Sequence, residues 1–366
     1  MTFDLTDIVL SLVKIAVVLG ALLNVTPIMV WVERRGSALI QDRVGPNRVG
    51  PFGFFQSIAD ALKFILKEDL VPAQASKWLY TIAPMFGLIP ALTTIAVVPF
   101  GRAFVIPERT VLGHTLFAGG RLFEPIVADV NIGLLLVFAL SSMGVYGIVT
   151  AGWSSNNKYA LFGGIRASAQ MISYELALTI SAVSVLMVAG SLRLVDVVQH
   201  QTGYFVLFNT IRIPAWNVFS PAMFLSFVIF TVAAFAETNR LPFDFAEADA
   251  ELVAGYHTEY SSMKFALFFM SEYMAMATIS ALIVTLFFGG WDIPWYNEPP
   301  TFFGFLLSAL AFVAKISVML FVFVWVRWTI PRLKYDLLMK AGWKIFLPLA
   351  VLNIILVAIF IAHHWI

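Results

Sequence analysis

The sequence predicts an all-α integral membrane protein with about eight transmembrane helices and an amphipathic surface helix after the first span. The 366 residues are 60% hydrophobic and 12% charged, about half the charged share of ordinary soluble domains, and the mean hydropathy is +0.88. Apolar windows of about 20 residues, long enough to cross a hydrocarbon core of about 30 Å, recur throughout. They lie at about 8–32, 78–99, 129–150, 167–190, 216–236, 265–289, 302–326 and 345–363.

The first apolar run is expected to be a retained span within a single polytopic membrane domain over 1–366. Its start carries Asp4 and Asp7 and lacks the basic cluster and cleavage site of a signal peptide. A loop at 33–77 follows, with apolar residues at helical spacing between Phe54 and Leu66, typical of a helix that lies along the membrane surface. The pattern leaves open whether this helix only anchors the chain or frames an opening for a lipid-soluble molecule.

Orientation is predicted from the uneven distribution of Lys and Arg between the two sets of connections. Sixteen basic residues flank one set: Arg34, Arg35, Arg43, Arg48, Lys63, Lys67, Lys77, Lys158, Arg166, Arg240, Lys264, Arg327, Arg332, Lys334, Lys340 and Lys344. Five flank the other set: Arg102, Arg109, Arg121, Arg193 and Arg212. The first set is therefore expected in the cytoplasm and both termini outside.

An acidic loop at 237–264 joins two apolar windows. It contains six carboxylates: Glu237, Asp244, Glu247, Asp249, Glu251 and Glu259. Asp244, Glu247 and Glu251 have the spacing i, i+3, i+7 and would share a helical face, so each raises the proton affinity of its neighbours. Such a row could form part of a proton pathway, or it could be a solvated surface that pairs with basic residues or a partner subunit.

Ionisable residues also fall within or at the edge of the spans, where charge is costly and functional by default. They are Lys14, Asp129, Glu175, Glu272 and Lys315. Glu175, about nine residues into its window, is the strongest proton-transfer candidate, and Glu272 could extend the row of acids into the membrane. For the two lysines we expect structural counter-ions.

Composition excludes several kinds of function. The chain has no cysteine, so disulfides, thiolate-held iron–sulfur clusters and cysteine-bound zinc are excluded, and no metal site is expected. A net charge of +1 does not indicate nucleic-acid binding. The turn-rich segment from Asp42 to Pro51 lacks the spacing and the lysine of a phosphate-binding loop.

Four segments resemble the H subunit of the bacterial proton-translocating NADH:quinone oxidoreductase, respiratory complex I. They begin with ERRGSALIQDRVGPNRVGPFGFFQSIADALKFILKED (33–69) and YALFGGIRASAQMISYELAL (159–178). AETNRLPFDFAEADAELVAGYHTEYSSMKFALFFMSEYM (236–274) and PRLKYDLLMKAGWKIFLPL (331–349) follow in the same order. Ala246 stands where the family is expected to have Pro, and Asp249 where Glu is common.

The resemblance implies a subunit without a redox centre of its own, which joins the hydrophilic and membrane arms and contributes to a quinone chamber. Ubiquinone or menaquinone would be the substrate, and FMN and the iron–sulfur clusters would be on partner subunits. Chamber or mouth residues implied by the motifs are Glu33, Arg34, Arg35, Asp60, Phe268, Phe269, Tyr273 and Arg327. The six acids of the loop, with Glu272, would link that chamber to Glu175 and move protons.

Three alternatives are retained at this stage. Intramembrane Glu and Lys also suit a stand-alone cation/proton transporter, although long charged loops favour docking to partners. The related membrane subunit of energy-converting hydrogenases shares ancestry without requiring a quinone. A purely structural anchor would tolerate amide replacements of its acids once assembled.

Overall fold

The computed structural model describes residues 5–107, 109–111, 114–116, 120–207, 211–246, 253–296 and 299–363. Its α-helices are α1 (Leu5–Ile40), α2 (Gln56–Leu66), α3 (Lys77–Thr93), α4 (Gly133–Ser154), α5 (Lys158–Ala189), α6 (Leu194–His200), α7 (Pro221–Glu237), α9 (Ser262–Phe287), α10 (Phe302–Thr329), α11 (Tyr335–Ala341) and α12 (Leu347–Ala362). Short helical turns are η1 (Pro51–Gly53), η2 (Thr94–Val97), η3 (Asn217–Phe219), η4 (Gly255–His257) and the π-helical turn η5 (Gly342–Phe346).

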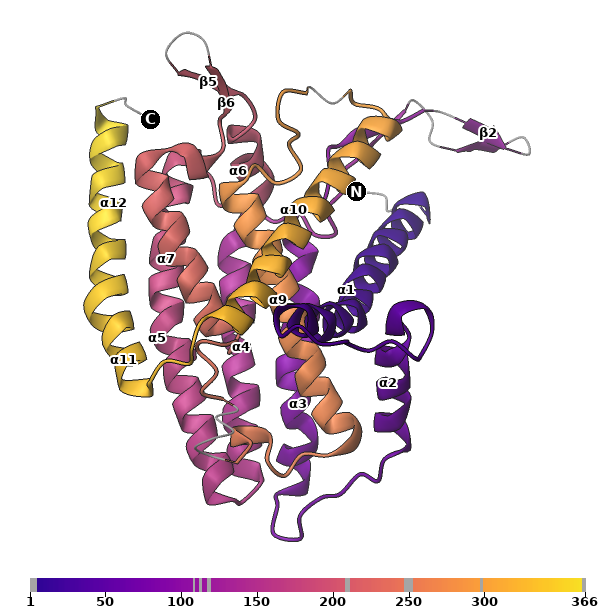
Figure 1. Cartoon of the computed structure of the whole chain (residues 1–366). Helices are drawn as coiled ribbons and strands as arrows, with labels where there is room; N and C mark the ends of the chain where they lie inside the picture. Colours follow the sequence, from indigo (N-terminus) through magenta and orange to yellow (C-terminus); the bar gives the residue numbers. More distant parts are fainter. Residues whose placement is uncertain are drawn as a thin grey trace.

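The described residues confirm the all-α membrane class. Seven helices are long and apolar enough to cross a bilayer: Asp7–Ile40, Lys77–Val97, Gly133–Ser154, Lys158–Ala189, Ser262–Phe287, Phe302–Thr329 and Tyr335–Ala362. The apolar helix α7 has 17 residues, the lower limit for a spanning helix, and it runs beside α5 (Figure 1). These eight helices correspond to the eight windows.

Two helices extend beyond the windows that predict them. α1 continues to Ile40, and α5 begins at Lys158. The windows end where charged residues begin, because a hydropathy scale treats every charge as solvated. In the fold these charges have partners: Glu33 contacts basic side chains of other segments, and Arg166 lies 5.0 Å above the ring of Tyr335.

The eight helices alternate in direction, so both described ends of the chain lie on the same side of the bundle (Figure 1). Three antiparallel strand pairs lie on that side. They are β1 (Phe104–Ile106) with β4 (Arg121–Phe123), β2 (Arg109–Val111) with β3 (His114–Leu116), and β5 (Tyr204–Leu207) with β6 (Ile211–Pro214). The apolar windows and the basic residues do not predict these strands. The connections that carry the sixteen basic residues lie toward the opposite side.

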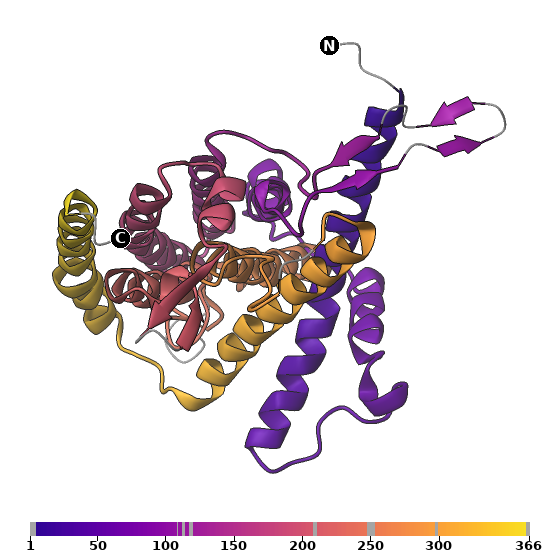
Figure 2. The ribbon, with the colours of Figure 1, turned by 90° about the horizontal axis from the view of Figure 1, so that it is seen from above.

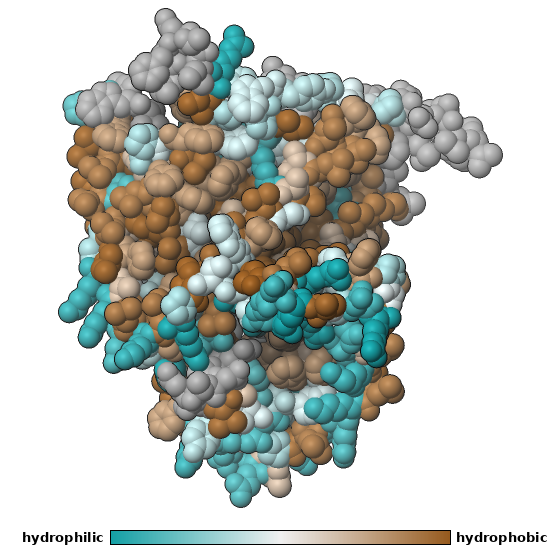
Figure 3. All heavy atoms as spheres, in the orientation of Figure 1, coloured by the Kyte–Doolittle hydropathy of each residue, from teal (hydrophilic) through white to brown (hydrophobic). Residues whose placement is uncertain are grey.

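The core forms around α9, which contacts α1, α3, α7 and α10 and is seen near the middle of the bundle in Figure 2. Close approach of α4 and α5 depends on glycine, because a Cβ at Gly152 would lie 2.6 Å from the carbonyl oxygen of Ala160. Small residues permit such contacts in membrane bundles, where van der Waals packing drives association. Figure 3 shows the matching surface, with hydrophobic side chains over α12, α7 and α10 and hydrophilic side chains in the lower part.

The surface helix α2 lies beside the end of α1 and the beginning of α9. The Ser57 hydroxyl donates a hydrogen bond of 2.8 Å to the carbonyl oxygen of Pro27 in α1. The Ser262 hydroxyl of α9 is 2.9 Å from the carbonyl oxygens of Phe64 and Lys67. The outer face of α2 remains apolar and exposed, as expected for a helix at a membrane surface; it consists of Ile58, Leu62, Ile65 and Leu66.

Candidate functional site: a buried ion cluster between two cavities

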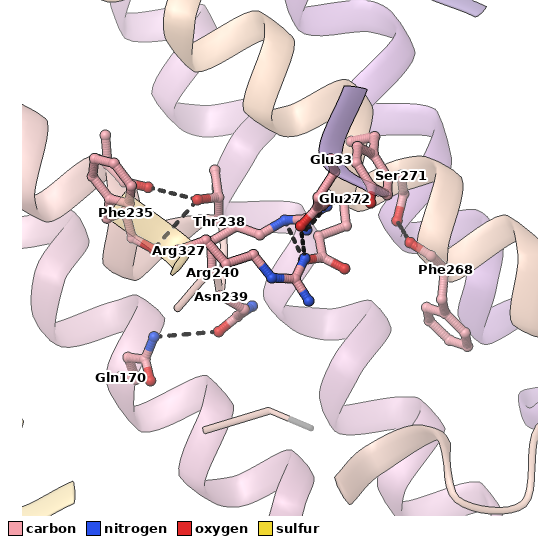
Figure 4. Close-up of polar contacts among 12 residues, drawn as sticks. Glu33, Gln170, Phe235, Thr238, Asn239, Arg240, Phe268, Ser271, Glu272 and Arg327 are labelled. Atoms are coloured by element: carbon pink, nitrogen blue, oxygen red, sulfur yellow. Dashed lines mark hydrogen bonds and ion pairs between the residues drawn. The ribbon is translucent and has the colours of Figure 1, made fainter. Parts of the chain in front are cut away.

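A cluster of ionisable side chains lies inside the bundle where α1, α9 and α10 meet the segment after α7. Arg240 is central: its Nη1 is 3.3 Å from both carboxylate oxygens of Glu33, and its Nε is 2.8 Å from Oε1 of Glu272. Arg327 and the Tyr273 hydroxyl both donate hydrogen bonds to Glu33. Figure 4 shows the side chains of Arg240 and Arg327 extending together toward Glu33 and Glu272.

The cluster balances two carboxylates against two guanidinium groups in a site largely closed to solvent. Glu33 is 6% exposed and Arg240 is 4% exposed. Burial acts against a charged Arg240, but Glu272, Tyr273 and Glu33 outweigh it and raise the pKa of Arg240 above its ordinary value. The guanidinium carbon also lies 4.1 Å from the centre of the Tyr273 ring, a cation–π contact. Arg240 is therefore a permanent buried cation.

The segment that carries Arg240 is fixed by hydrogen bonds from neighbouring helices. Gln170 of α5 donates from Nε2 to the carbonyl oxygens of Ala236 and Phe243, at 2.6 and 2.8 Å. Beyond α10, Arg332 donates to the carbonyl oxygen of Asp244. Since both ends of the turn are held, the position of the Arg240 guanidinium is determined by the fold.

A cavity of about 110 Å³ lies between α3, α4, α7 and α9, next to the cluster. Its polar lining consists of Thr94, Ser141, Glu237, Thr238, Asn239, Tyr256, Ser271, Glu272 and Thr278. One buried water molecule needs roughly 10–15 Å³ of such space, so the cavity has room for several water molecules. Glu237 and Ser141 both line this cavity, and the buried Oε2 of Glu237 has no hydrogen-bond partner among the described residues.

A second, smaller cavity of about 30 Å³ is lined by the cluster itself. Its lining residues are Asn239, Arg240, Leu241, Asp244, Phe269, Glu272 and Arg327. Asn239 and Glu272 line both cavities. The ion pair between Arg240 and Glu272 therefore stands at the boundary between the two cavities.

Glu175 of α5 lies close enough to Glu237 for their negative charges to repel each other. Glu175 and Glu237 are both half-buried, and the Oε2 atom of Glu237 is closed to solvent. The described acids thus form a sequence through the interior, from Glu33 by way of Arg240 to Glu272, then along the larger cavity to Glu237 and on to Glu175.

The proposed chamber residues fall into two groups. Glu33, Tyr273 and Arg327 are in direct contact within the ion cluster. Phe269, which packs edge-on against Tyr273 at 4.9 Å, lines the smaller cavity, and Phe268 lines the larger one.

The second group lies where the end of α1 faces α2. Arg34 forms an ion pair of 2.5 Å with Asp60 of α2. Arg35 donates to the carbonyl oxygens of Pro46 and Phe52, at 3.2 and 3.1 Å. It therefore holds the turn between the two helices.

The structure describes only some of the acids in the predicted acidic loop. Glu247, Asp249 and Glu251 lie outside the described residues. Asp244 lines the smaller cavity. Glu259 lies at the far end of the loop, where its Oε1 accepts a hydrogen bond of 2.6 Å from Asn157.

That far end of the loop is firmly packed. The rings of Tyr80 and Tyr260 stack at 4.1 Å, and the Tyr80 hydroxyl donates to the carbonyl oxygen of Glu259 at 2.7 Å. Burial raises the pKa of Tyr260 to about 12, although a hydrogen bond with Ser154 acts in the opposite direction. Tyr260 therefore remains a neutral anchor at physiological pH.

Three other ionisable candidates, within or at the edge of the spans, contact groups on the hairpin side of the bundle. Lys315 donates to the carbonyl oxygens of Phe288, Gly290 and Asp292, at 2.8, 3.0 and 2.6 Å. Lys14 contacts the carbonyl oxygen of Glu124 at 3.4 Å, and Asp129 precedes α4 and pairs with Arg193. No group of three or more metal-ligating side chains is found within the described ranges.

Sequence reasoning underrated Arg240 and missed Asn239, Ser141 and Ser271. In the sequence Arg240 stands only among the sixteen basic residues that predict the orientation. A usable signal was present: an arginine three residues after an apolar helix, in a chain with Glu33 and Glu272 to neutralise. The small polar residues carry no such signal, because Ser and Asn occur in membrane helices for many reasons.

The fold and the site define a polytopic membrane protein with a permanent buried cation between two internal cavities. A family model described as NADH dehydrogenase matches residues 13–358. The chain belongs to the NADH dehydrogenase family, which confirms the resemblance seen in the motifs. Its helices and buried ion cluster are therefore those of a member of that family.

Curated relatives match almost the whole length. The NADH-quinone oxidoreductase H subunit 2 of Koribacter versatilis is 46% identical over 355 residues, 97% of this chain and 98% of the relative. The NADH-quinone oxidoreductase H subunit 1 of Geobacter metallireducens is 47% identical over 349 residues, 95% of each chain. The eighth NADH-quinone oxidoreductase subunit of Rhodothermus marinus is 44% identical over 356 residues, 94% of this chain and 95% of the relative.

Proposed function

We propose that this chain is the membrane subunit of a bacterial NADH:quinone oxidoreductase that forms part of the quinone chamber and couples quinone reduction to proton translocation. Relatives named as subunits of that enzyme, matching over nearly all of both chains, support this proposal. The observation that carries the mechanism is the ion cluster of Glu33, Arg240 and Glu272 at the boundary of two cavities.

The quinone side of the site is the region where α1, α2 and α9 meet. Aromatic side chains at the start of α2, Phe54 and Phe55, are exposed and would face a lipid-soluble substrate that enters from the membrane. Arg34 and Asp60 join α1 to α2 at this mouth. Tyr273 and Arg327, in contact with Glu33, supply hydroxyl and guanidinium donors at the inner end.

Proton transfer in this proposal depends on the acids of this chain. FMN and iron–sulfur clusters on partner subunits would supply the electrons, and the two-electron reduction of the quinone to the quinol would take up two protons. Negative charge that develops near Glu33 raises the proton affinity of the surrounding acids. Arg240 contacts both Glu33 and Glu272, so a change on one side alters the electrostatic balance on the other, and the larger cavity leads on to Glu237 and Glu175.

The orientation follows from the basic residues. We place the connections rich in Lys and Arg in the cytoplasm of a bacterial cell, with the chain in the inner membrane and both termini in the periplasm. Residues 33–77 and the acidic loop at 237–264 would then face the partner subunits that carry the redox centres. The common side of the two described ends agrees with this arrangement.

Two rival functions lead to different outcomes on purification. A stand-alone cation/proton transporter would purify as a monomer or homo-oligomer, whereas the proposed subunit co-purifies with peripheral and membrane partners. The membrane subunit of an energy-converting hydrogenase would co-purify with hydrogenase rather than NADH:quinone reductase activity. A structural anchor would assemble and leave both reductase activity and pumping insensitive to loss of buried acids.

The decisive experiment replaces Glu237 by Gln, which keeps the shape and removes the exchangeable charge. Native gels, NADH:quinone reductase activity and proton pumping are measured in the same membranes. We expect an assembled complex in which pumping falls at least about 10-fold. The control is Glu68→Gln, an exposed acid after α2, which should change nothing. Unchanged reductase activity and pumping in the Glu237 variant would refute the proposed proton path.

A further inference from the structure

On the outer face of the C-terminal helices, three lysines lead into an apolar stripe. Lys334 precedes α11, Lys340 lies in its last turn, and Lys344 lies in the π-helical turn η5; all three are at least partly exposed. Apolar residues continue at helical spacing along the outer face of α12: Pro348, Leu352, Ile355 and Ile359. The opposite face of α12 is buried against the bundle.

Other basic residues of this region already have partners inside the protein. Arg332 binds the carbonyl oxygen of Asp244 and lies 5.3 Å from the centre of the Phe245 ring. Arg166 lies over the rings of Phe245 and Tyr335, at 5.5 and 5.0 Å. These arginines hold the fold together and are not available to an external ligand.

The three lysines differ in this respect. Within the described part of the chain, no carboxylate lies within 4.0 Å of the ammonium groups of Lys334, Lys340 or Lys344. α11 carries one acid, Asp336, against these three lysines, so the described residues of this surface keep a net positive charge. Figure 3 shows the corresponding contrast, with hydrophilic side chains over α11 beneath the hydrophobic face of α12.

The surface is held in place by contacts with α5. The Tyr174 hydroxyl donates to the carbonyl oxygen of Leu338 at 3.0 Å, and the Trp343 indole nitrogen donates to the Ser173 hydroxyl at 3.2 Å. Trp343 is 50% exposed, as expected for a ring at the level of lipid headgroups. A π-helical turn is uncommon and often marks a functional site; here it carries Lys344.

We propose that this surface binds an anionic phospholipid. Its phosphate would lie against Lys340 and Lys344, and an acyl chain would run along Leu352, Ile355 and Ile359. Basic clusters at the cytoplasmic end of a transmembrane helix attract anionic headgroups, and the apolar stripe continues from the charges into the membrane. An acidic peptide would match the lysines alone, whereas a phospholipid matches both the lysines and the stripe.

The test uses the intact complex in nanodiscs of phosphatidylcholine that contain a trace of phosphatidylglycerol with a photoreactive acyl chain. After illumination, cross-linked lipid is mapped by mass spectrometry to peptides from 347–362. Lys340→Gln combined with Lys344→Gln should reduce the apparent affinity for the probe roughly 25-fold, about 5-fold for each lysine near the surface. The matched control is Lys67→Gln with Lys77→Gln, two exposed lysines elsewhere on the basic side.

Specific outcomes separate the possibilities. Cross-linking of the anionic probe to α12 that falls in the Lys340/Lys344 variant and persists in the control supports the lipid site. Equal labelling by a phosphatidylcholine probe would mean that the stripe is only a bilayer-facing surface. An assembled complex in which a partner subunit covers these lysines, so that no lipid labels α12, would also overturn the proposal.

Discussion

Replacement of Arg240 by Gln is the most informative perturbation of the ion cluster. It removes the cation that contacts Glu33 at 3.3 Å and Glu272 at 2.8 Å. Arg327 still neutralises Glu33, so the main electrostatic loss is at Glu272. Breaking one partner of a buried ion pair costs about 3–5 kcal/mol, because an uncompensated charge remains. We therefore expect a less stable subunit and a loss of coupling between reductase activity and pumping.

A double-mutant cycle separates the charge effect from the loss of packing. In Arg240→Gln with Glu272→Gln, two neutral amides replace the ion pair, which can be nearly neutral energetically when both partners are exchanged. The combined variant should recover about 1–3 kcal/mol relative to the sum of the two single variants. Thermal denaturation of the purified complex measures stability, and native gels check assembly.

The coupling of quinone reduction to proton pumping should respond to these substitutions differently from the stability of the complex. The double variant lacks the acid at the cavity boundary, so pumping should stay low even where stability returns. Arg240→Lys, which keeps the charge but loses the geometry for two simultaneous contacts, should retain part of the pumping. If Arg240→Gln preserves both stability and the ratio of protons pumped to NADH oxidised, the central role given to Arg240 is wrong.

Three further predictions concern single contacts. Gly163→Ala would place a Cβ 2.7 Å from the Cα of Gly255, and this overpacking should cost about 1–3 kcal/mol and increase proteolysis of the loop; normal protease resistance would contradict it. Tyr273→Phe removes a hydrogen bond to Glu33 and should lower stability by roughly 1.5–3 kcal/mol and raise the apparent KM for quinone, so an unchanged KM would exclude this residue from the chamber. Lys315→Met leaves three carbonyl groups after α9 without their ammonium donor and should lower the melting temperature of the complex without changing its pumping ratio; altered pumping at normal stability would show that this role is not only structural.

The features predictable from sequence are those set by local composition. Each apolar window contains enough hydrocarbon to require a membrane, so the number and order of the spans follow directly. The two sides of the bundle follow from the basic residues in the connections. Strands β1 to β6 were not predictable in this way, because segments of three or four residues with Pro, Gly and aromatic neighbours show no sustained alternation.

The ion cluster depends on contacts that sequence does not display. Arg240 and Glu33 are separated by 207 positions, and Arg327 and Glu33 by 294. These side chains come together only because α1 and α10 pack against each other and against the segment after α7. For the same reason the two cavities could not be predicted, since the larger one combines residues of α3, α4, α7 and α9, and the smaller one combines residues of α9 and α10 with the segment after α7.

The charge balance of the cluster suits it to the proposed coupling. At separations near 3–4 Å and an effective dielectric constant of about 20, one unit charge alters the energy of another by about 4 kcal/mol. One pH unit corresponds to about 1.36 kcal/mol, so protonation of Glu33 would remove an attraction to Arg240 worth roughly three pH units and would leave Glu272 as the carboxylate that pairs with Arg240. The cluster is neutral, and Glu33 and Glu272 share one cation, Arg240. A single protonation at Glu33 can therefore change the electrostatic balance at Glu272, at the boundary of the two cavities. In an unbalanced row of carboxylates, the same proton would be distributed over many sites.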